Sequence, residues 1–275
     1  MRPQTMIHIQ ESNKAYFATE QRFEDYFAIE GEVRKRFKNR RTIRFERAGR
    51  GFFIKCHQGV GWREIVKNLV QLRRPVIGAR QEWQAIQRLQ SLGVATMNAV
   101  GYGVQGWNPA RQYSFLITED LGPNVSLEDL TRDWRAKPPD PRLKRALISR
   151  LAAIARRLHE NGVNHRDFYI CHFLLDTSLG PKSYHPDHLR INVIDLHRAQ
   201  LRKRTPERWI IKDIGSLYFS AMDIGLTQRD LWRFMTVYRD RPLRTILRDE
   251  ARFWRKVQRR AIRLYRATWN TAPPL

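Results

Sequence analysis

Alternation of apolar and polar residues dominates the first 120 positions and predicts an antiparallel sheet. Five runs have the two-residue period of strands, at positions 29–37, 42–48, 52–57, 97–102 and 112–118. Gly49-Arg50-Gly51 joins two of these runs and predicts a tight turn. Helical patterns cover 62–72 and 80–92, with a break at Pro75 between them and a stop at Gly93.

Beyond position 120 the apolar spacing changes to three and four residues, which predicts helices. The longest lies at 142–160, a shorter one is expected at 127–134, and most of 212–268 is helical. Short strand signals remain at 173–175 and 191–194. Glu119-Asp120-Leu121-Gly122-Pro123 has the composition of a hinge between the two patterns. We therefore expect an α+β fold with two lobes. Residues 1–120 form a small antiparallel-sheet lobe with one main helix, and residues 121–275 form a larger helical lobe.

The net charge indicates that the binding partners are polyanions. The chain has 51 Lys and Arg against 27 Asp and Glu, a formal net charge of +24. Such a surface attracts nucleic acid, anionic lipid, phosphorylated glycolipid or an acidic protein. Composition alone favours a nucleic-acid-binding protein that is not an enzyme, although no zinc-finger, heptad-zipper or aromatic Gly-rich strand motif accompanies the charge.

Cysteine content and hydropathy indicate a folded protein of a reducing compartment. The two cysteines, Cys56 and Cys171, are too few for a disulfide framework. Positions 1–14 lack the apolar core of a signal peptide. The apolar run at 146–155 is interrupted by Arg150 and is far shorter than the roughly 18 residues of a spanning helix. Neither export nor a transmembrane segment is expected.

A catalytic loop follows the long predicted helix. His165-Arg166-Asp167 begins the pattern His-Arg-Asp-x-x-x-x-Asn of phosphotransferases, with His172 in place of the final Asn. Phosphoryl transfer needs a carboxylate that orients the attacking hydroxyl and accepts its proton. Asp167 is the candidate. An isolated His-Arg-Asp triplet is more often a helix cap or a surface feature, so the assignment depends on its context.

Two further patterns supply that context. Asp195 ends a short apolar strand, where such a carboxylate holds magnesium in kinases. Lys55 lies within the apolar run 52–57, where an unpaired ammonium is costly, and alternation places it on one face with Phe53 and His57. Glu82 on the following helix is its expected partner. The pair predicts an anchor for the α- and β-phosphates.

Four stretches make the chain resemble the lipopolysaccharide core heptose(I) kinase family of Gram-negative bacteria. They are 75–83, 164–175, 193–200 and 241–250, and the resemblance runs from about Ile29 to near the C-terminus. It implies a protein-kinase-like fold, ATP and magnesium as cofactors, and phosphorylation of the first heptose of the lipopolysaccharide inner core. It also implies a place at the cytoplasmic face of the inner membrane.

The resemblance assigns a role to each candidate residue. Asp167 is the catalytic acid, with His165 and Arg166 beside it. Asp195 is the metal ligand, and we place His172 with it at the second metal position. Lys55 anchors the phosphates and Glu82 pairs with it. We assign Glu119 and Leu121 of the hinge to nucleotide binding, and we expect the 4-hydroxyl of the heptose to be the acceptor.

Two departures from general kinases concern the phosphates and the metal. No G-x-G-x-x-G lies between the first two strands, where Lys38-Asn39-Arg40-Arg41 forms the turn instead. Backbone amides or basic side chains must therefore cover the phosphates. His172 replaces an amide, and a neutral imidazole is a poor magnesium ligand, so a positioning role is the alternative.

Several alternatives remain open on sequence. The acceptor could be another inner-core sugar such as Kdo, or a protein side chain. Cys56-His57 and Cys171-His172 could form a zinc site, although no Cys-x-x-Cys spacing supports it. A C-terminal helix has one apolar stripe, which we expect to pack on the helical lobe, and arginines elsewhere that suit a membrane surface or an acidic protein. No nucleic-acid partner is expected once the motifs are considered.

Overall fold

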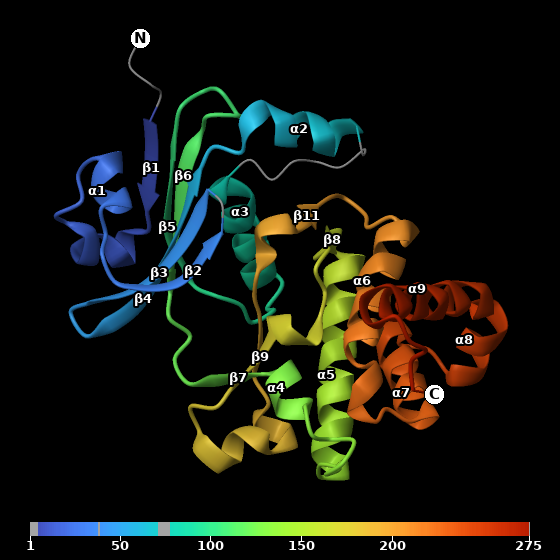
Figure 1. The fold of residues 1–275 in the computed structure, drawn as a ribbon. Helices are drawn as coiled ribbons and strands as arrows, with labels where there is room; N and C mark the ends of the chain where they lie inside the picture. Colours follow the sequence, from blue (N-terminus) through green and yellow to red (C-terminus); the bar gives the residue numbers. More distant parts are fainter. Residues whose placement is uncertain (1–4, 38, 71–77, 275) are drawn as a thin grey trace. The chain divides into compact units, whose positions relative to one another are not determined.

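The computed structural model describes residues 5–37, 39–70 and 78–274. The chain divides into two compact units (Figure 1). Unit 1 contains residues 1–88, 97–122 and 196–198, and unit 2 contains residues 89–96, 123–195 and 199–275. Pro75, the first part of the 75–83 stretch and Lys38 of the predicted turn lie outside the described residues.

Unit 1 is built on one antiparallel sheet of six strands in the order β1-β5-β6-β4-β3-β2. The strands are β1 (Thr5–Ile9), β2 (Glu32–Phe37), β3 (Arg40–Arg47), β4 (Arg50–Gln58), β5 (Ala99–Gln105) and β6 (Tyr113–Glu119). Five of them match the predicted runs within three residues at either end. The sixth, β1, pairs with β5 at the edge of the sheet and was not expected from the sequence. Thr5 and His8 break its apolar pattern, so backbone pairing rather than periodicity defines it.

A two-residue turn at Ala48 and Gly49 joins β3 to β4, with Arg47 paired to Arg50. Both turn residues have positive φ, 46° and 75°, which matches the twist of a hairpin. The turn therefore begins one residue earlier than predicted, and Arg50 belongs to the strand. This short connection fixes the register that sends Lys55 and Phe52 to opposite faces of β4.

Aromatic side chains cover one face of this sheet. The segment 11–17 and α1 (Phe23–Phe27) bring Phe17 and Tyr26 against the strands. The Tyr26 ring stacks on Phe115 with centroids 4.4 Å apart, and Phe17 lies edge-on to Phe52 at 5.5 Å. Phe52 is fully buried in this cluster. Successive side chains of a strand point to opposite faces, so the odd-numbered residues of β4, which include Lys55, lie on the other face of the sheet.

Two helices follow β4. α2 (Gly61–Val70) precedes α3 (Ala79–Ser91), whose first part packs on the second face of the sheet. There the backbone N–H of Ala79 donates to Ser114 Oγ on β6, and the Trp83 ring lies 4.9 Å from that of Tyr102 on β5. α3 ends before Gly93, whose φ of +64° is the left-handed conformation of a helix stop. The predicted stop is confirmed.

Unit 2 is mainly helical, with two small sheets. Its helices are α4 (Leu127–Thr131), α5 (Pro141–Glu160), α6 (Glu207–Ser220), α7 (Gln228–Arg239), α8 (Leu243–Asp249) and α9 (Ala251–Trp269). One sheet has the order β10-β9-β7, from β7 (Asn124–Ser126), β9 (Phe173–Asp176) and β10 (Ile191–Val193). The other pairs β8 (Val163–Asn164) with β11 (Gln200–Leu201). The predicted mixed α+β fold is confirmed.

Helix α5 runs through the middle of unit 2, with α7 packed along it, and α9 packs along α6 (Figure 1). The predicted C-terminal helix is divided at Glu250 into α8 and α9. Its apolar stripe is largely buried, since Ile246, Val257, Ala261 and Tyr265 are covered. The stripe therefore packs on the unit, as expected. No helix in the described part of the chain is long and apolar enough to cross a membrane.

Candidate active site

Unit 1 contains the predicted ion pair between a strand lysine and a helix glutamate. Lys55 on β4 donates from Nζ to Oε1 of Glu82 on α3, over 2.5 Å. The Glu82 side chain is 1% exposed and that of Lys55 is 23% exposed. The lysine can therefore reach a ligand from the side that stays open, while the glutamate holds it in place.

The glutamate has unused hydrogen-bonding capacity. Its second oxygen, Oε2, is buried and has no hydrogen-bond partner among the described residues. A buried unsatisfied carboxylate oxygen is costly, and such sites are often functional ones. Nearby His57, on the same face of β4, is buried, and desolvation lowers its pKa to about 3, with further effects from Arg40, Lys55 and His197. It is therefore neutral and adds no positive charge beside Lys55.

The predicted catalytic loop, residues 165–172 of unit 2, has a distinctive backbone at its second residue. Arg166 has a φ of +76°, the left-handed conformation that a non-glycine residue rarely adopts. Two backbone N–H groups hold it there, because those of His165 and Arg166 donate to the carboxylate of Asp213 on α6, over 2.7 and 2.9 Å. The carboxylate thus fixes the residue that immediately precedes Asp167.

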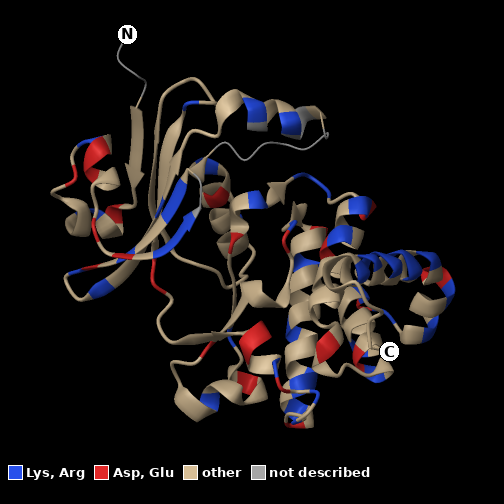
Figure 2. Ribbon diagram, viewed as in Figure 1, with Lys and Arg blue, Asp and Glu red and all other residues tan. Residues whose placement is uncertain are grey.

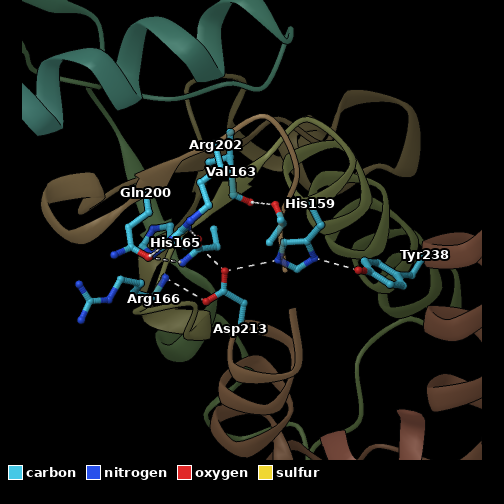
Figure 3. A network of polar contacts seen from close by, with 10 residues as sticks. His159, Val163, His165, Arg166, Gln200, Arg202, Asp213 and Tyr238 are labelled. Atoms are coloured by element: carbon cyan, nitrogen blue, oxygen red, sulfur yellow. Dashed lines mark hydrogen bonds and ion pairs between the residues drawn. The ribbon is translucent and has the colours of Figure 1, made fainter. Parts of the chain in front are cut away.

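Asp213 belongs to a buried polar network (Figure 3). Its Oδ2 lies 3.4 Å from Nε2 of His159 on α5, whose Nδ1 lies 2.9 Å from the Tyr238 hydroxyl on α7. Burial raises the pKa of Tyr238 well above its ordinary value, so the phenol keeps its proton. The network links α5, α6 and α7 to the catalytic loop, and it was not predicted from the sequence. The available signal was a lone carboxylate in the apolar segment Trp209–Leu217.

His165 connects the catalytic loop to the strand that precedes Asp195. Its Nε2 donates to the carbonyl of Ile194 over 2.9 Å. The ring is buried, and desolvation lowers its pKa, so it is neutral with the proton on Nε2. We therefore place His165 among the groups that position the loop. Phe168, fully buried against Phe173 at 5.0 Å, anchors the loop from the apolar side.

His172 and Asp195 face each other. His172 Nδ1 lies 2.7 Å from the backbone oxygen of Asp167, so Nδ1 carries the proton, because a carbonyl only accepts. Its Nε2 lies 3.4 Å from Oδ2 of Asp195. Asp195 has a φ of +60°. The backbone N–H of the preceding Ile194 donates to the carbonyl of His172. The two predicted metal residues are thus neighbours, and Asp167 is tied to both through the loop.

This donor set fits magnesium with the nucleotide supplying most of the oxygens. Magnesium is typically held by one or two carboxylates together with substrate phosphates. Asp195 supplies such a carboxylate, and its side chain is 30% exposed, so it can reach a cation. Among the described residues no group of three or more His, Cys, Asp or Glu side chains could hold a metal by itself. The zinc alternative built on Cys56 and Cys171 therefore gains no support.

The predicted hinge residues lie at the end of β6 in unit 1. The Glu119 carboxylate accepts from Arg50 Nη2 over 2.7 Å and from Asn98 Nδ2 over 2.9 Å. Asp120 accepts from Arg44 Nε over 2.8 Å and caps the N–H of Gly122. The carboxylates at 119 and 120 are engaged by side chains. A nucleotide at this position would therefore contact the backbone of Glu119 and Leu121 rather than the glutamate side chain.

Comparison with known proteins identifies relatives over nearly the whole chain. Residues 24–238 match the lipopolysaccharide kinase (Kdo/WaaP) family. The lipopolysaccharide core heptose(I) kinase WaaP of Pseudomonas aeruginosa is 56% identical over 243 residues, which are 88% of this chain and 90% of the relative. The protein of the same name from Escherichia coli K12 is 50% identical over 242 residues, again 88% and 90%.

A solved structure described as WaaP in complex with acyl carrier protein is also similar. Its sequence is 48% identical to this chain, and the TM-score is 0.80. The match covers 94% of this chain and 99% of the solved one. The structural comparison and the sequence comparison therefore identify the same group of relatives.

Proposed function

This chain belongs to the lipopolysaccharide kinase (Kdo/WaaP) family, and we propose that it transfers the γ-phosphate of ATP to the first heptose of the lipopolysaccharide inner core, at the 4-hydroxyl. Relatives named as core heptose(I) kinases, 56% and 50% identical, support a sugar kinase acting on this core. The observation that carries the proposal is the catalytic loop around Asp167, whose backbone is fixed by Asp213.

The proposed chemistry assigns one task to each residue. Asp167 orients the heptose hydroxyl and accepts its proton during transfer. Lys55, held by Glu82, binds the α- and β-phosphates. Asp195 holds magnesium, with His172 beside it at the second metal position. When bound, the metal neutralises charge on the phosphates. The backbone of Glu119 and Leu121 binds the base of the nucleotide.

We assign these tasks to two lobes. Residues 1–120 form the nucleotide-binding lobe, with Lys55 and Glu82. Residues 121–275 form the catalytic lobe, with Asp167, Asp195 and the acceptor site. The absence of a glycine-rich loop in the sequence leaves phosphate cover to backbone amides and to Arg40, which begins β3 and is paired with His57 on the Lys55 face of the sheet.

Phosphorylation of purified acceptor tests the proposal. The protein, ATP and magnesium are incubated with unphosphorylated lipopolysaccharide, and the product is analysed by mass and by the position of the new phosphate. Phosphate on the 4-hydroxyl of the first heptose is expected. Phosphate on Kdo would redirect the acceptor assignment, and the absence of transfer would overturn the proposal.

Two variants separate the catalytic carboxylate from the metal ligand. Asp167→Asn keeps the size of the side chain but removes its basicity, so kcat should fall about 100- to 10,000-fold with ATP affinity little changed. Asp195→Asn should weaken nucleotide binding and turnover together. Wild-type turnover by Asp167→Asn would remove Asp167 from the reaction.

We also propose an acidic protein partner, acyl carrier protein. The support is a relative of known structure, described as a complex with that protein, together with the net charge of +24. Figure 2 shows closely spaced basic positions along α9, and the exposed ones include Arg252, Arg255, Arg259 and Arg263. Co-purification of the two proteins, lost on Arg255→Glu/Arg259→Glu, is the expected result; retention would exclude this face of α9.

Peripheral contact with the cytoplasmic face of the inner membrane is our proposed localisation. Trp62, Val66 and Val70 form an exposed stripe on α2, at 56%, 52% and 78% exposure. Arg63 and Lys67 flank it, which suits anionic lipid. Sedimentation with anionic vesicles tests this contact. Trp62→Ala should weaken binding several-fold, whereas Trp107→Ala, which removes another exposed indole, should not. Equal loss in both variants would exclude α2 as the contact.

A further inference from the structure

Four cationic side chains of unit 2 surround one indole ring. Trp209 on α6 has Arg166, Arg202 and Arg208 with their Cζ atoms 5.5, 5.6 and 5.6 Å from the ring centroid. Lys212 Nζ lies 4.2 Å from the same centroid. The cations come from the catalytic loop, from the residue after β11, and from the first two turns of α6. Segments far apart in the sequence thus concentrate positive charge at one place.

The position of this cluster adds to its positive potential. α6 begins at Glu207 after Pro206, which makes no side-chain cap hydrogen bond. The N-terminus of a helix carries a partial positive charge, so Arg208 in the first turn is unfavourably placed there, although Glu207 in the same turn is acidic. A bound anion offsets this cost, because helix amides and basic side chains then serve the same ligand.

Polar contacts hold two of the arginines in place. Arg202 donates to Oε1 of Gln200 over 2.6 Å and to Oδ1 of Asn164 (Figure 3). Both acceptors are amide oxygens, and these contacts orient the guanidinium. Arg166 is fixed through its backbone N–H, which donates to Asp213. The Arg202 guanidinium and the backbone of Arg166 are therefore preorganised.

Arg166 and Asp167 are consecutive residues, so their Cα atoms are about 3.8 Å apart. Arg166 therefore adjoins the residue that is proposed to serve the acceptor hydroxyl. We propose that Arg166, Arg202 and Arg208, arranged around Trp209, bind a carboxylate or phosphate of the acceptor glycan and thereby position its hydroxyl. This inference rests on the proposed function, because it names the part of the acceptor that is recognised beside Asp167.

Substitutions of Arg208 test the site without altering the loop. Arg208 is exposed and is the second residue of α6; Arg229, also exposed, is the second residue of α7 and provides a matched control. We expect Arg208→Gln to raise the KM for lipopolysaccharide about 10-fold and Arg208→Glu to raise it further, with the KM for ATP unchanged. Arg208→Lys should recover part of the loss. Arg229→Gln and Arg229→Glu make the same charge changes and should leave both constants near wild type.

Modified acceptors identify the anion. One preparation has its carboxylates reduced to alcohols, and another has its phosphates removed with hydrofluoric acid. The effect of Arg208→Gln should disappear on the acceptor that lacks the recognised group, and wild-type KM should rise on that acceptor alone. If wild-type protein is active but Arg208 and Arg229 variants behave alike, or both modified acceptors are used like the native one, the anion site is excluded. If wild-type protein transfers no phosphate to lipopolysaccharide, the proposed function fails, and this inference fails with it.

Discussion

Two buried carboxylates, one in each unit, are held in different ways. Glu82 in unit 1 and Asp213 in unit 2 have the same side-chain exposure of 1%. Glu82 has one ionic partner, Lys55, and an oxygen without a hydrogen-bond partner among the described residues. Asp213 accepts from two backbone N–H groups and lies beside His159. One oxygen of Glu82 thus receives no hydrogen bond from a described residue, whereas both oxygens of Asp213 accept one.

This difference predicts which substitutions lower the stability of the fold and which lower activity. A fully satisfied buried carboxylate supports the fold, because its removal leaves buried donors without acceptors. A carboxylate with an unsatisfied oxygen that restrains a partly exposed lysine supports ligand binding instead. The following substitutions test this distinction, beginning with the largest expected effect.

Asp213→Ala should cause the largest loss. Two backbone N–H groups of the catalytic loop lose their acceptor, at a cost of about 3–5 kcal/mol in free energy of unfolding. This corresponds to a fall in Tm of roughly 6–15 °C for a chain of this size. Thermal unfolding measures it, with exposed Asp187→Ala as the control. A Tm near wild type would show that the loop does not depend on Asp213.

Lys55 and Glu82 should respond asymmetrically. Lys55→Met leaves Glu82 buried without its ionic partner and should cost about 3 kcal/mol. Glu82→Gln leaves a lysine that reaches solvent and should cost about 1 kcal/mol, while the KM for ATP rises several-fold. The double variant Lys55→Met/Glu82→Gln should be more stable than Lys55→Met alone, since no buried charge remains. Urea unfolding of the three variants measures the coupling, and equal costs for the single variants would contradict it.

Acid should weaken both regions through a buried histidine in each. The pKa of His57 is lowered to about 3 and that of His165 is also lowered, in both cases mainly by desolvation. Below about pH 6.5 each histidine binds a proton in the unfolded state but not in the folded state, so the free energy of unfolding falls as pH decreases. Each group contributes about 1.4 kcal/mol per pH unit in the window between its two pKa values.

His57→Leu isolates the contribution of unit 1. Between pH 6.5 and 5, the free energy of unfolding of this variant should fall by about 2 kcal/mol less than that of wild type, as measured by urea unfolding at both pH values. Identical pH dependence in the two proteins would mean that His57 is charged in the folded state.

The hinge carboxylate should show the smallest effect. Arg50 and Glu119 form an ion pair whose arginine is largely exposed, and such pairs contribute about 0–1 kcal/mol. Arg50→Gln should therefore change Tm by no more than about 3 °C, and less at high salt. A larger loss would place Glu119 with Asp213 as a structural carboxylate.

The sequence by itself determined the local structure and the residue types for the proposed chemistry. Two-residue alternation placed Lys55 on one face of its strand with Phe53 and His57, and the helical pattern that ends at Gly93 placed Glu82 on the following helix. The loop from His165 to His172 and the strand before Asp195 were recognisable because their spacing is fixed along the chain. Local periodicity and motif spacing are properties of neighbouring residues, so one chain is enough to read them.

Only the tertiary structure decided which distant groups complete these local elements. β1 lacks a clear apolar period and becomes a strand because β5 offers an unpaired edge. The break between α8 and α9 falls at Glu250, whose carboxylate accepts from Arg239 of α7. Asp213 lies 47 and 48 positions from the two residues whose backbone N–H groups donate to it, and the cations around Trp209 come from three segments. These contacts depend on chain folding over long sequence separations, where neither alternation nor spacing carries the information.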